Sequence, residues 1–497
     1  MEHSKNRGTS TLVRRALPVL VLAVSLILMT GAVAADMAYT PSTAWYTDHQ
    51  SPYTVSTAED LAGLSQIVAS GTDTFAGKTI LLGADIQMNT NLKDIKEVLN
   101  LKNFASIGPS TETPFEGTFD GQGHTISGLY STGNGLFYTG NNCVIKNLNI
   151  VDSSIVSPNP ITGAVIGYSL GDSAIENCHV RDTTVYVTSV GTGDVGGIAG
   201  LVVKGYLLGC SVENCTIVCA NADYTGGIVG YADDETAFAG CSAKNTVVIC
   251  GKSGSGGIIG YAFTDVFLNS CTVDTCYIES LYDNYVGGIA GYGGSEATFD
   301  NCLVTNSEVK AYKHSVGGIA GYTYRAIFTG IASKVENTVV ESEIEEYVGG
   351  FIGSTNKPIL ITVANTRNCE LVSSRVVGGI EGYSTNVGIL VGRGTISANA
   401  DPVKISTSIV GNPNAPETTD KTLFNLAGTS YTDNGWIVST KETEIVNGQV
   451  YGTPDKVFVV PEVFSDLNQK ETAKTPLPIA GIIAGLGAAA VFLARRH

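Results

Sequence analysis

The sequence predicts an all-β fold in which short strands stack as a parallel β-solenoid with coils of about 30 residues. Three observations predict it: a recurring Gly-Gly doublet, repeated units that read as short strands, and the composition of a turn-rich β protein. The chain of 497 residues contains 59 Gly and 22 Tyr, and only 15% of its residues are charged. No stretch among the repeats shows helical periodicity over about ten residues or more.

The doublet gives the length of the repeat. Its first glycines lie at 196, 226, 256, 287, 317, 349 and 378, at intervals of 30, 30, 31, 30, 32 and 29 residues. An earlier, degenerate copy, "TGAVIGYS", contains Gly163. Each unit reads as three short strands. Such a unit cannot bury an apolar face alone, but copies stacked about 4.8 Å apart can.

Two other repeat architectures fit less well. A propeller blade usually needs roughly 40–50 residues, which is longer than the observed interval, and the Leu-x-x-Leu-x-Leu phrase of leucine-rich repeats is missing. The solenoid repeats are therefore assigned to residues 135–395.

The segments that flank the repeats are expected to close the two ends of the stack. Residues 57–71, "TAEDLAGLSQIVASG", have the period of an amphipathic helix, whose apolar face consists of Leu61, Leu64, Ile67 and Val68. Because an open solenoid end exposes unpaired strand edges, we expect an N-terminal capping region over 35–134 that contains this short helix. Strand-like runs predict a C-terminal cap over 396–464, and a polar tether follows at 465–476.

Both termini predict export to the cell surface. Residues 1–34 read as a signal peptide, with basic residues, an apolar run and the small-residue site Ala32-Val33-Ala34; an uncleaved anchor is the alternative. A second apolar run at 477–494 precedes Arg495 and Arg496. It is long enough for a single C-terminal transmembrane helix, or it is a sorting tail that is removed after export. The expected localisation is the cell surface, with the bulk of the chain extracellular.

The charge balance narrows the choice of partners. Lys and Arg number 29 against 46 Asp and Glu, so the formal net charge is −17, which argues against binding to nucleic acid. Glycans or other surface proteins are the expected partners, together with the membrane through the C-terminal segment, and self-association is compatible with the repeats. No cofactor and no metal are expected.

The repeated phrases resemble a known family. "VGGIAGY" followed by "CTVDTC"-type strings at 30-residue spacing is similar to GLUG-motif repeats of exported prokaryotic surface proteins. The string from "STAEDLAGL" to "VIKNLNI" resembles the leader that precedes such repeats, so the resemblance covers roughly 55–395. It implies a right-handed parallel β-helix with an adhesin-like or structural role at the cell envelope.

Tyrosine recurs at a fixed place in the repeat. Five residues after the repeat Gly stand Tyr168, Tyr231, Tyr261, Tyr292, Tyr322 and Tyr383, whereas Leu201 and Ser354 occupy the two exceptions. These rings form either a stacked row that stabilises a corner of the coil or an exposed track on which sugar rings bind. The sequence leaves both readings open.

Cysteine recurs in the same way. Five cysteines lie 14 or 15 residues after their repeat Gly and are expected to form an inward-facing core ladder: Cys178, Cys210, Cys241, Cys271 and Cys302. Cys215, Cys276 and Cys369 lie 19 or 20 residues after theirs. Adjacent rungs are close enough for disulfides, but the total of 11 cysteines is odd.

Catalysis is the competing hypothesis, because parallel β-helices also carry polysaccharide lyases and glycoside hydrolases. Hydrolysis needs paired carboxylates, and lyases need an Arg or Lys base near bound calcium. The acidic runs at 233–235 and 341–346 are typical of solvated loops or faces, and no basic residue forms a convincing cluster with carboxylates. We therefore assign no catalytic residue. The sequence favours a membrane-anchored surface protein with a structural or adhesin-like role over a surface lyase or glycosidase.

Overall fold

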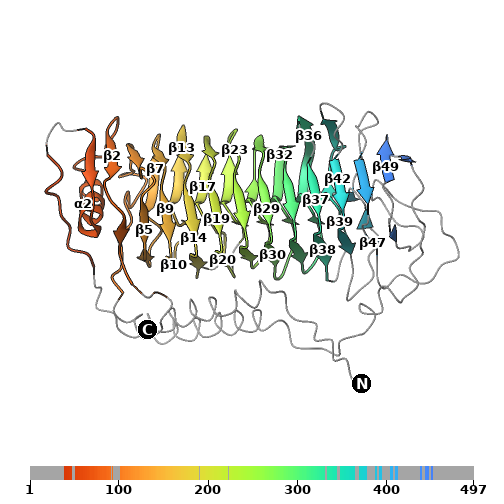
Figure 1. The fold of residues 1–497 in the computed structure, drawn as a ribbon, viewed down its shortest axis with the longest axis horizontal. Helices are drawn as coiled ribbons and strands as arrows, with labels where there is room; N and C mark the ends of the chain where they lie inside the picture. Colours follow the sequence, from red (N-terminus) through yellow and green to blue (C-terminus); the bar gives the residue numbers. More distant parts are fainter. Residues whose placement is uncertain are drawn as a thin grey trace, which may run out of the picture.

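The described strands of the computed structural model build a right-handed parallel β-solenoid, as the sequence predicts, with coils of about 31 residues (Figure 1). The structure describes residues 38–47, 51–90, 92, 101–189, 191–221, 223–330, 333–343, 347–363, 369–377, 387–388, 391–393, 403–406, 409–411, 437–438, 443–446 and 449–451.

One complete coil contains five strands instead of the three that the sequence suggests. In chain order they are β16 (Asp194–Gly196), β17 (Ala199–Val203), β18 (Gly205–Leu208), β19 (Ser211–Glu213) and β20 (Thr216–Cys219). Each strand pairs in parallel with its counterparts in the neighbouring coils, so residues of the same kind form columns along the axis. The five strands contribute to four sheets, because β17 and β18 both belong to one wide sheet.

We name these sheets broad, polar, narrow and short. The broad sheet contains β17 and β18 together with β1 (Tyr53–Val55), β2 (Thr79–Leu82), β4 (Thr118–Asp120), β7 (Phe137–Asn141), β8 (Val144–Lys146), β12 (Ile166–Leu170), β13 (Ser173–Glu176), β22 (Val229–Asp233), β23 (Ala237–Ala239), β27 (Ile259–Ala262), β28 (Val266–Asn269), β32 (Ala290–Asp300), β36 (Ala320–Gly330), β40 (Ile352–Thr355), β41 (Leu360–Val363) and β45 (Val391–Arg393). The short sheet contains β16 with β11 (Ile161–Gly163), β21 (Thr225–Gly226), β26 (Ser255–Gly256), β31 (Val286–Gly287), β35 (Val316–Gly317), β39 (Val348–Gly349) and β44 (Val387–Gly388).

The other two sheets complete the coil. The polar sheet contains β19 with β3 (Ile86–Gln87), β5 (Thr125–Ser127), β9 (Asn149–Val151), β14 (His179–Arg181), β24 (Ser242–Lys244), β29 (Thr272–Asp274), β33 (Leu303–Thr305), β37 (Lys334–Glu336), β42 (Cys369–Val372), β46 (Val403–Ser406), β49 (Thr443–Val446) and β50 (Gln449–Tyr451). The narrow sheet contains β20 with β6 (Tyr130–Ser131), β10 (Ser154–Ser157), β15 (Thr184–Val187), β25 (Val247–Cys250), β30 (Tyr277–Ser280), β34 (Glu308–Ala311), β38 (Val339–Ser342), β43 (Arg375–Val377), β47 (Ile409–Gly411) and β48 (Ile437–Val438).

A column of left-handed residues turns the chain between the polar and narrow sheets. Their φ angles lie between 47° and 55°, and the column comprises Asp152, Asp182, Asn214, Asn245, Thr275, Asn306, Asn337 and Ser373. Asn and Asp adopt this conformation more readily than other non-glycine residues. The side-chain amide of Asn337 donates to the Oδ1 of Asn306 over 2.7 Å, which ties two coils together at the corner.

The Gly-Gly doublets lie where other backbone segments approach closely. A Cβ on Gly227 would overlap the carbonyl oxygen of Gly257 in the next coil, and a Cβ on Gly226 would overlap the carbonyl of Val229. The doublet is therefore required by close backbone contact, while the following apolar residue, such as Ile228, is buried in the core.

The N-terminal end of the stack is covered by α2 (Ala58–Ala69), as predicted for residues 57–71. Thr57 accepts a hydrogen bond from the backbone N–H of Asp60, and the Asp60 carboxylate accepts from the N–H of Thr57, which forms a capping box. Leu61, Leu64 and Val68 of α2 are buried against the core. The predicted amphipathic face is confirmed.

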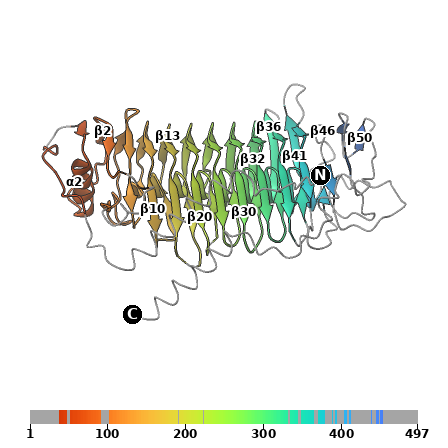
Figure 2. The same ribbon diagram turned by 60° about the horizontal axis from the view of Figure 1, so that its bottom comes forward.

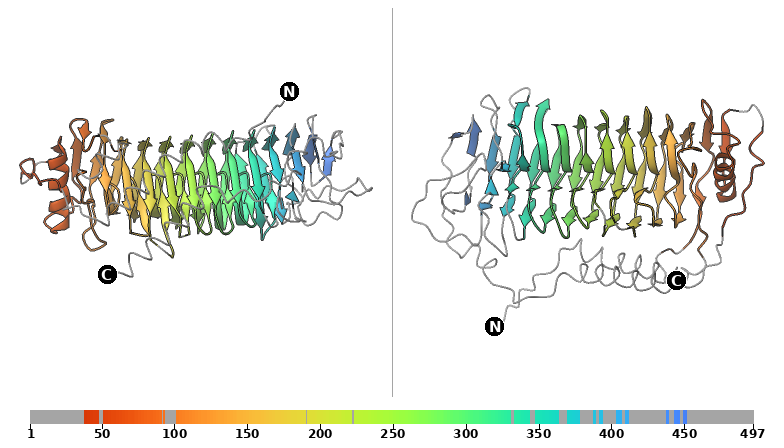
Figure 3. Two further views of the ribbon diagram at one scale, coloured as in Figure 1. Left: turned by 90° about the horizontal axis from the view of Figure 1, so that it is seen from below. Right: turned by 180° about the vertical axis from the view of Figure 1, so that it is seen from behind.

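Parallel pairing extends beyond the interval 135–395 predicted for the repeats. It begins with β1 and β2 and continues to β46 and β47. Antiparallel pairings follow, because β49 pairs with β46 and β48 pairs with β47. Figure 2 shows β46 and β50 at the end opposite α2, and Figure 3 shows the same stack from two further sides.

The predicted signal peptide (1–34), tether (465–476) and transmembrane segment (477–494) lie outside the described residues. Within the described part of the chain, no helix is long and apolar enough to cross a bilayer.

Candidate functional site

Four of the predicted tyrosines form a continuous stack on the broad sheet. Tyr231 in β22, Tyr261 in β27, Tyr292 in β32 and Tyr322 in β36 are paired in register in consecutive coils. Their ring centroids are separated by 5.2, 4.4 and 4.6 Å, with interplanar angles of 1°, 6° and 27°. All four are partly exposed. Each inner ring therefore covers the faces of its neighbours and shows mainly its edge and hydroxyl to solvent.

Partial burial affects the phenol groups of this stack. Burial, together with nearby charges, raises the pKa of Tyr231 and of Tyr322 to about 12. The hydroxyls of these two tyrosines are therefore neutral hydrogen-bonding groups at physiological pH. They can donate to and accept from a polar ligand without changing charge.

The column is interrupted on both sides of the stack. Tyr168 is separated from Tyr231 by Leu201, which occupies the same place in the intervening coil. Tyr168 instead contacts Tyr138, at 5.4 Å between ring centroids and an angle of 76°. Beyond Tyr322 the column continues with Ser354.

The register places a different residue in this column of the last coil. Ser354 pairs with Arg393, so Arg393 and not Tyr383 occupies this column in the last coil. β43 belongs to the narrow sheet, and the doublet beginning at 378 lies outside the described residues. The short-sheet position is taken by Gly388, which pairs with Gly349. Tyr383 itself lies outside the described residues.

A second set of tyrosines, which the sequence reading missed, flanks the stack. Tyr224, Tyr285 and Tyr347 directly precede strands of the short sheet in alternate coils, with Gly254 and Ser315 between them. Tyr224 leans over Gly254 and lies 4.4 Å from Tyr261. The signal in the sequence is an alternation of large and small residues just before the doublet.

Further aromatic side chains are exposed on the broad sheet. Tyr206 (45% exposed), Phe263 (47%), Phe267 (49%) and Tyr324 (40%) point outward from this sheet or from the turn between its strands. Phe263 lies 6.0 Å from Tyr261 in a parallel arrangement. We call the following set the aromatic face: Tyr206, Tyr231, Tyr261, Phe263, Phe267, Tyr292, Tyr322 and Tyr324. Of the seven large apolar side chains that are exposed in the described part of the chain, five including Leu208 lie on this sheet.

The predicted cysteine ladder lies inside the coil. Cys178, Cys210, Cys241, Cys271 and Cys302 directly precede strands of the polar sheet in consecutive coils, and all five thiols are buried and free. In β42, Cys369 directly precedes the residue that pairs with Lys334. Cys369 therefore belongs to this column and not to the column of Cys215 and Cys276. The long segment 356–368 increases the number of residues between Cys369 and its repeat Gly.

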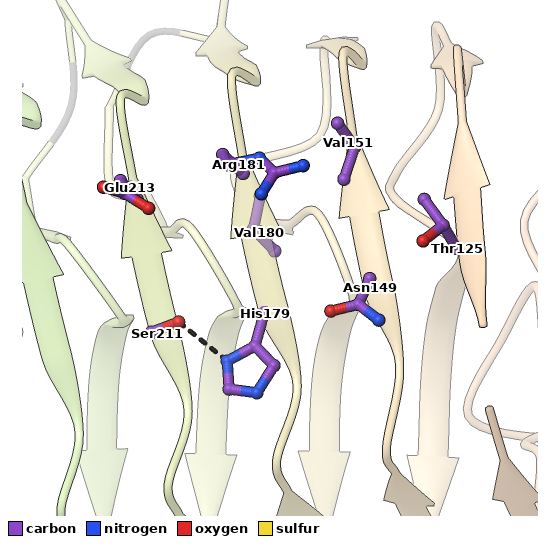
Figure 4. A pocket seen from close by; sticks show the side chains of 8 residues that line it. All are labelled: Thr125, Asn149, Val151, His179, Val180, Arg181, Ser211 and Glu213. Carbon is purple, nitrogen blue, oxygen red and sulfur yellow. Dashed lines mark hydrogen bonds between the residues drawn. The ribbon is translucent and has the colours of Figure 1, made fainter. Parts of the chain in front are cut away.

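The polar sheet carries a shallow groove of about 410 Å³. It is lined by outward side chains of four neighbouring strands, Thr125, Asn149, Val151, His179, Arg181, Ser211 and Glu213, with Val180 below them (Figure 4). The Nδ1 of His179 lies 2.7 Å from the Oγ of Ser211. Burial lowers the pKa of His179, so its ring is neutral near pH 7.

The groove does not contain the groups that glycoside hydrolysis needs. Glu213 is the single carboxylate among its lining residues, and it lies 3.8 Å from the ammonium of Lys244. Retaining and inverting glycosidases use two carboxyl groups on opposite sides of the bond. The His179–Ser211 contact is therefore a cross-strand hydrogen bond in a polar surface that can bind polar ligands.

The acidic runs do not form a metal site in the described part of the chain. Asp233 caps its own turn by accepting from the backbone N–H of Asp234. Glu341 pairs with Lys310 over 3.1 Å, and residues 344–346 of the second run lie outside the described part. Among the described residues, no group of three or more His, Cys, Asp or Glu side chains could hold a metal ion.

Comparison with known proteins gives two solved structures of low similarity. The sequence matches no protein-family model and no curated protein. A suggested immunoglobulin A1 protease from Bacteroides ovatus is 18% identical, with a TM-score of 0.34, over 59% of this chain and 76% of the other. The A-module of the Azotobacter vinelandii mannuronan C-5 epimerase AlgE4 is 11% identical, with a TM-score of 0.22, over 65% and 92%. At these scores neither likeness supports a statement about function, and the resemblance to GLUG-motif repeats stays a prediction.

Proposed function

We propose that this protein is an exported, membrane-anchored surface protein whose β-solenoid has an adhesin-like role and binds polysaccharide on its aromatic face. The apolar segments at 1–34 and 477–494 support export and anchoring. The observation that carries the binding role is the concentration of exposed rings on one sheet of the solenoid.

The chemistry of this face suits a carbohydrate. Aromatic rings provide apolar contact area and, in tyrosine, a hydroxyl that forms hydrogen bonds, which matches a sugar with apolar C–H groups and polar edges. Inside the stack the ring faces are covered by neighbouring rings, so sugar rings would contact Phe263, Phe267, Tyr206 and Tyr324, while the stacked tyrosines offer their hydroxyls. The repeat of the coils would present the same contacts several times to a chain polymer.

The test is a polysaccharide-binding screen of the full-length protein. The variant Tyr206→Ala/Phe263→Ala/Phe267→Ala removes three exposed rings from the aromatic face, and we expect at least about tenfold weaker binding. The matched control is Tyr282→Ala/Tyr312→Ala, because these rings are similarly exposed (44% and 38%) but follow strands of the narrow sheet. Absence of binding to every polysaccharide, or an equal loss in both variants, contradicts the proposal.

A further inference from the structure

The interruption of the tyrosine column leaves a notch in the aromatic face. Its sides are Tyr168 in one coil and Tyr231 two coils further on, and Leu201 lies between them in register. Next to Leu201 in the same coil stands Asp194, at the position that Tyr224 takes in the following coil, because Val195 pairs with Thr225. We call these residues, Tyr168, Asp194, Leu201 and Tyr231, the notch.

The spacing of the coils sets the width of the notch. Coils repeat every 4.8 Å or so, which places Tyr168 and Tyr231 about 9.6 Å apart along the axis. In the intact part of the column one tyrosine ring fills each step, with centroids 4.4 and 4.6 Å apart. Leucine is shorter than tyrosine, so the outer part of this step is not filled by Leu201. Within the described residues, no aromatic ring covers the sides of Tyr168 and Tyr231 that face this step.

A carboxylate without a counter-ion stands at the edge of this space. The side chain of Asp194 is largely buried, and no described residue gives it a hydrogen bond or an ion pair. Burial, and then the nearby charge of Asp223, raises the pKa of Asp194 to about 7. Its charge also acts on the hydroxyls of Tyr168 and Tyr231, which places the carboxylate close to both sides of the notch.

The other charges near the notch also favour a cation. Asp223 lies on the neighbouring coil and is partly buried, and burial raises its pKa. The basic side chain of Lys252 acts on Asp223 and donates to the backbone carbonyl of Gly191 over 3.1 Å, and no basic group acts on the pKa of Asp194. An unpaired buried carboxylate is costly, and the electron-rich face of tyrosine attracts positive charge.

We propose that the notch binds an amino-sugar residue of a polysaccharide, with the sugar ring between Tyr168 and Tyr231 and its protonated amine on the carboxylate of Asp194. This inference rests on the proposed function, since it names the sugar class that one place on the solenoid would select. A neutral sugar would fill the same space but would leave the carboxylate unpaired. A simple cation would pair with the carboxylate but would leave the ring faces uncovered.

The test compares two ligands that differ only in the amine. Oligomers of glucosamine and of N-acetylglucosamine with the same linkage are titrated into the full-length protein at neutral pH by calorimetry. We expect the glucosamine oligomer to bind at least about tenfold more tightly, since a hydrogen-bonded charge pair typically contributes that much.

Three variants separate the notch from general charge attraction. Asp194→Asn removes the carboxylate, and Leu201→Tyr completes the column with a ring in register, so each should reduce binding of the glucosamine oligomer by about tenfold or more. Asp233→Asn is the matched control, because it removes one negative charge from the broad sheet, two residues after Tyr231. Leu201→Tyr should melt no lower than the parent protein, which shows that its loss of binding is not a loss of fold.

The outcomes distinguish this inference from the proposed function. Equal affinity for the two oligomers, or an equal effect of Asp233→Asn and Asp194→Asn, contradicts the proposal that the notch binds an amino sugar. If binding is lost in the aromatic-face variant but kept in Asp194→Asn, the polysaccharide-binding role is supported and the amino-sugar site at the notch is contradicted. If no oligomer or polysaccharide binds at all, both are overturned.

Discussion

Asp194 shows how a single residue can give one coil a property that the others lack. In the short-sheet column it stands between Ile161 and Tyr224, both of which are uncharged. The neighbouring step of the tyrosine column holds Leu201 in place of a tyrosine. Two departures from the repeat thus coincide in one coil, where they place an unpaired carboxylate beside the notch-facing sides of two tyrosine rings.

The carboxyl of Asp194 predicts a change of stability with pH. Its pKa is about 7 in the fold, whereas an Asp in an unfolded chain titrates near about 3.9. Below about pH 4 the group is protonated in both states and has no effect. Between about pH 4 and 7 only the unfolded chain releases the proton, so the free energy of unfolding falls as pH rises, by up to about 1.4 kcal/mol per pH unit.

The measurement is urea denaturation of the parent protein and Asp194→Asn at several pH values. The stability of Asp194→Asn relative to the parent should increase from pH 4 to 7 and then stay constant. The same series on Asp233→Asn gives the general effect of removing one negative charge. A difference between parent and Asp194→Asn that does not vary with pH would show that the carboxyl is not held in its neutral form.

Among the elements, the cysteine column shows how a β-solenoid uses small apolar side chains. Each thiol directly precedes a strand of the polar sheet, points into the coil and is covered by the coils on either side. The Sγ of Cys302, for example, lies 3.4 Å from the carbonyl oxygen of Leu268 in the preceding coil. Free cysteine behaves as a small hydrophobic residue in such a site.

The buried thiols should not react in the native protein. Burial raises the pKa of Cys143 to about 11 and that of Cys215, Cys250 and Cys276 to about 12, so the reactive thiolate is scarce as well as inaccessible. We expect maleimide to label none of the 11 cysteines in the native chain and all of them in urea, as counted by mass spectrometry.

A variant with one exposed cysteine controls for reagent activity. Lys244 is exposed on the polar sheet, so Lys244→Cys should acquire a single label without urea. Native labelling of Cys210 or Cys241 at the rate of the Lys244→Cys thiol would contradict the buried column.

The elements also show what the sequence could and could not predict. The interval between doublets gives the number of residues in a coil. This follows because parallel in-register strands place equivalent residues of neighbouring coils opposite each other, so the sequence repeats once per coil. The helix at 57–71 was predictable from its apolar period and its capping residues. Five strands per coil were not, since corners such as Asn245 bend the chain without interrupting the apolar pattern. Cys369 was assigned to the wrong column because segments of variable length change the residue count between strands in the last coils.

The candidate binding site was only partly predictable for a related reason. The tyrosine column is visible as a period in the sequence, whereas Phe263, Phe267 and Tyr206 occur once each and join it only through the sheet. Asp194 directly precedes "VGGIAGL" and looks like an ordinary surface residue. The role proposed for Asp194 depends on its neighbours in the preceding and the following coil. Those neighbours are known only once the strand register is known.

At the scale of the whole molecule, the stack depends on the cover of its N-terminal end. The broad sheet begins with β1, and α2 packs Leu61 and Leu64 against the core there. A parallel sheet that ends without such a cover offers unpaired backbone groups and apolar side chains to another copy.

Leu64→Asp should therefore both destabilise the chain and promote association. A charge in this fully buried place should lower the free energy of unfolding by about 3 kcal/mol or more. Size-exclusion chromatography with light scattering should then detect oligomers. Gln66→Asp places the same charge on the exposed side of α2 and should remain as stable and as monodisperse as the parent. Equal behaviour of the two variants would show that α2 does not protect the end.

The in-register stacking has a consequence for how such a protein can vary. Loss or gain of one whole coil, for instance the 30 residues from 229 to 258, would leave every remaining column aligned. The rod would become about 4.8 Å shorter or longer while its lateral surfaces kept their chemistry. The length of the stack and the chemistry of its sides can thus change independently of each other.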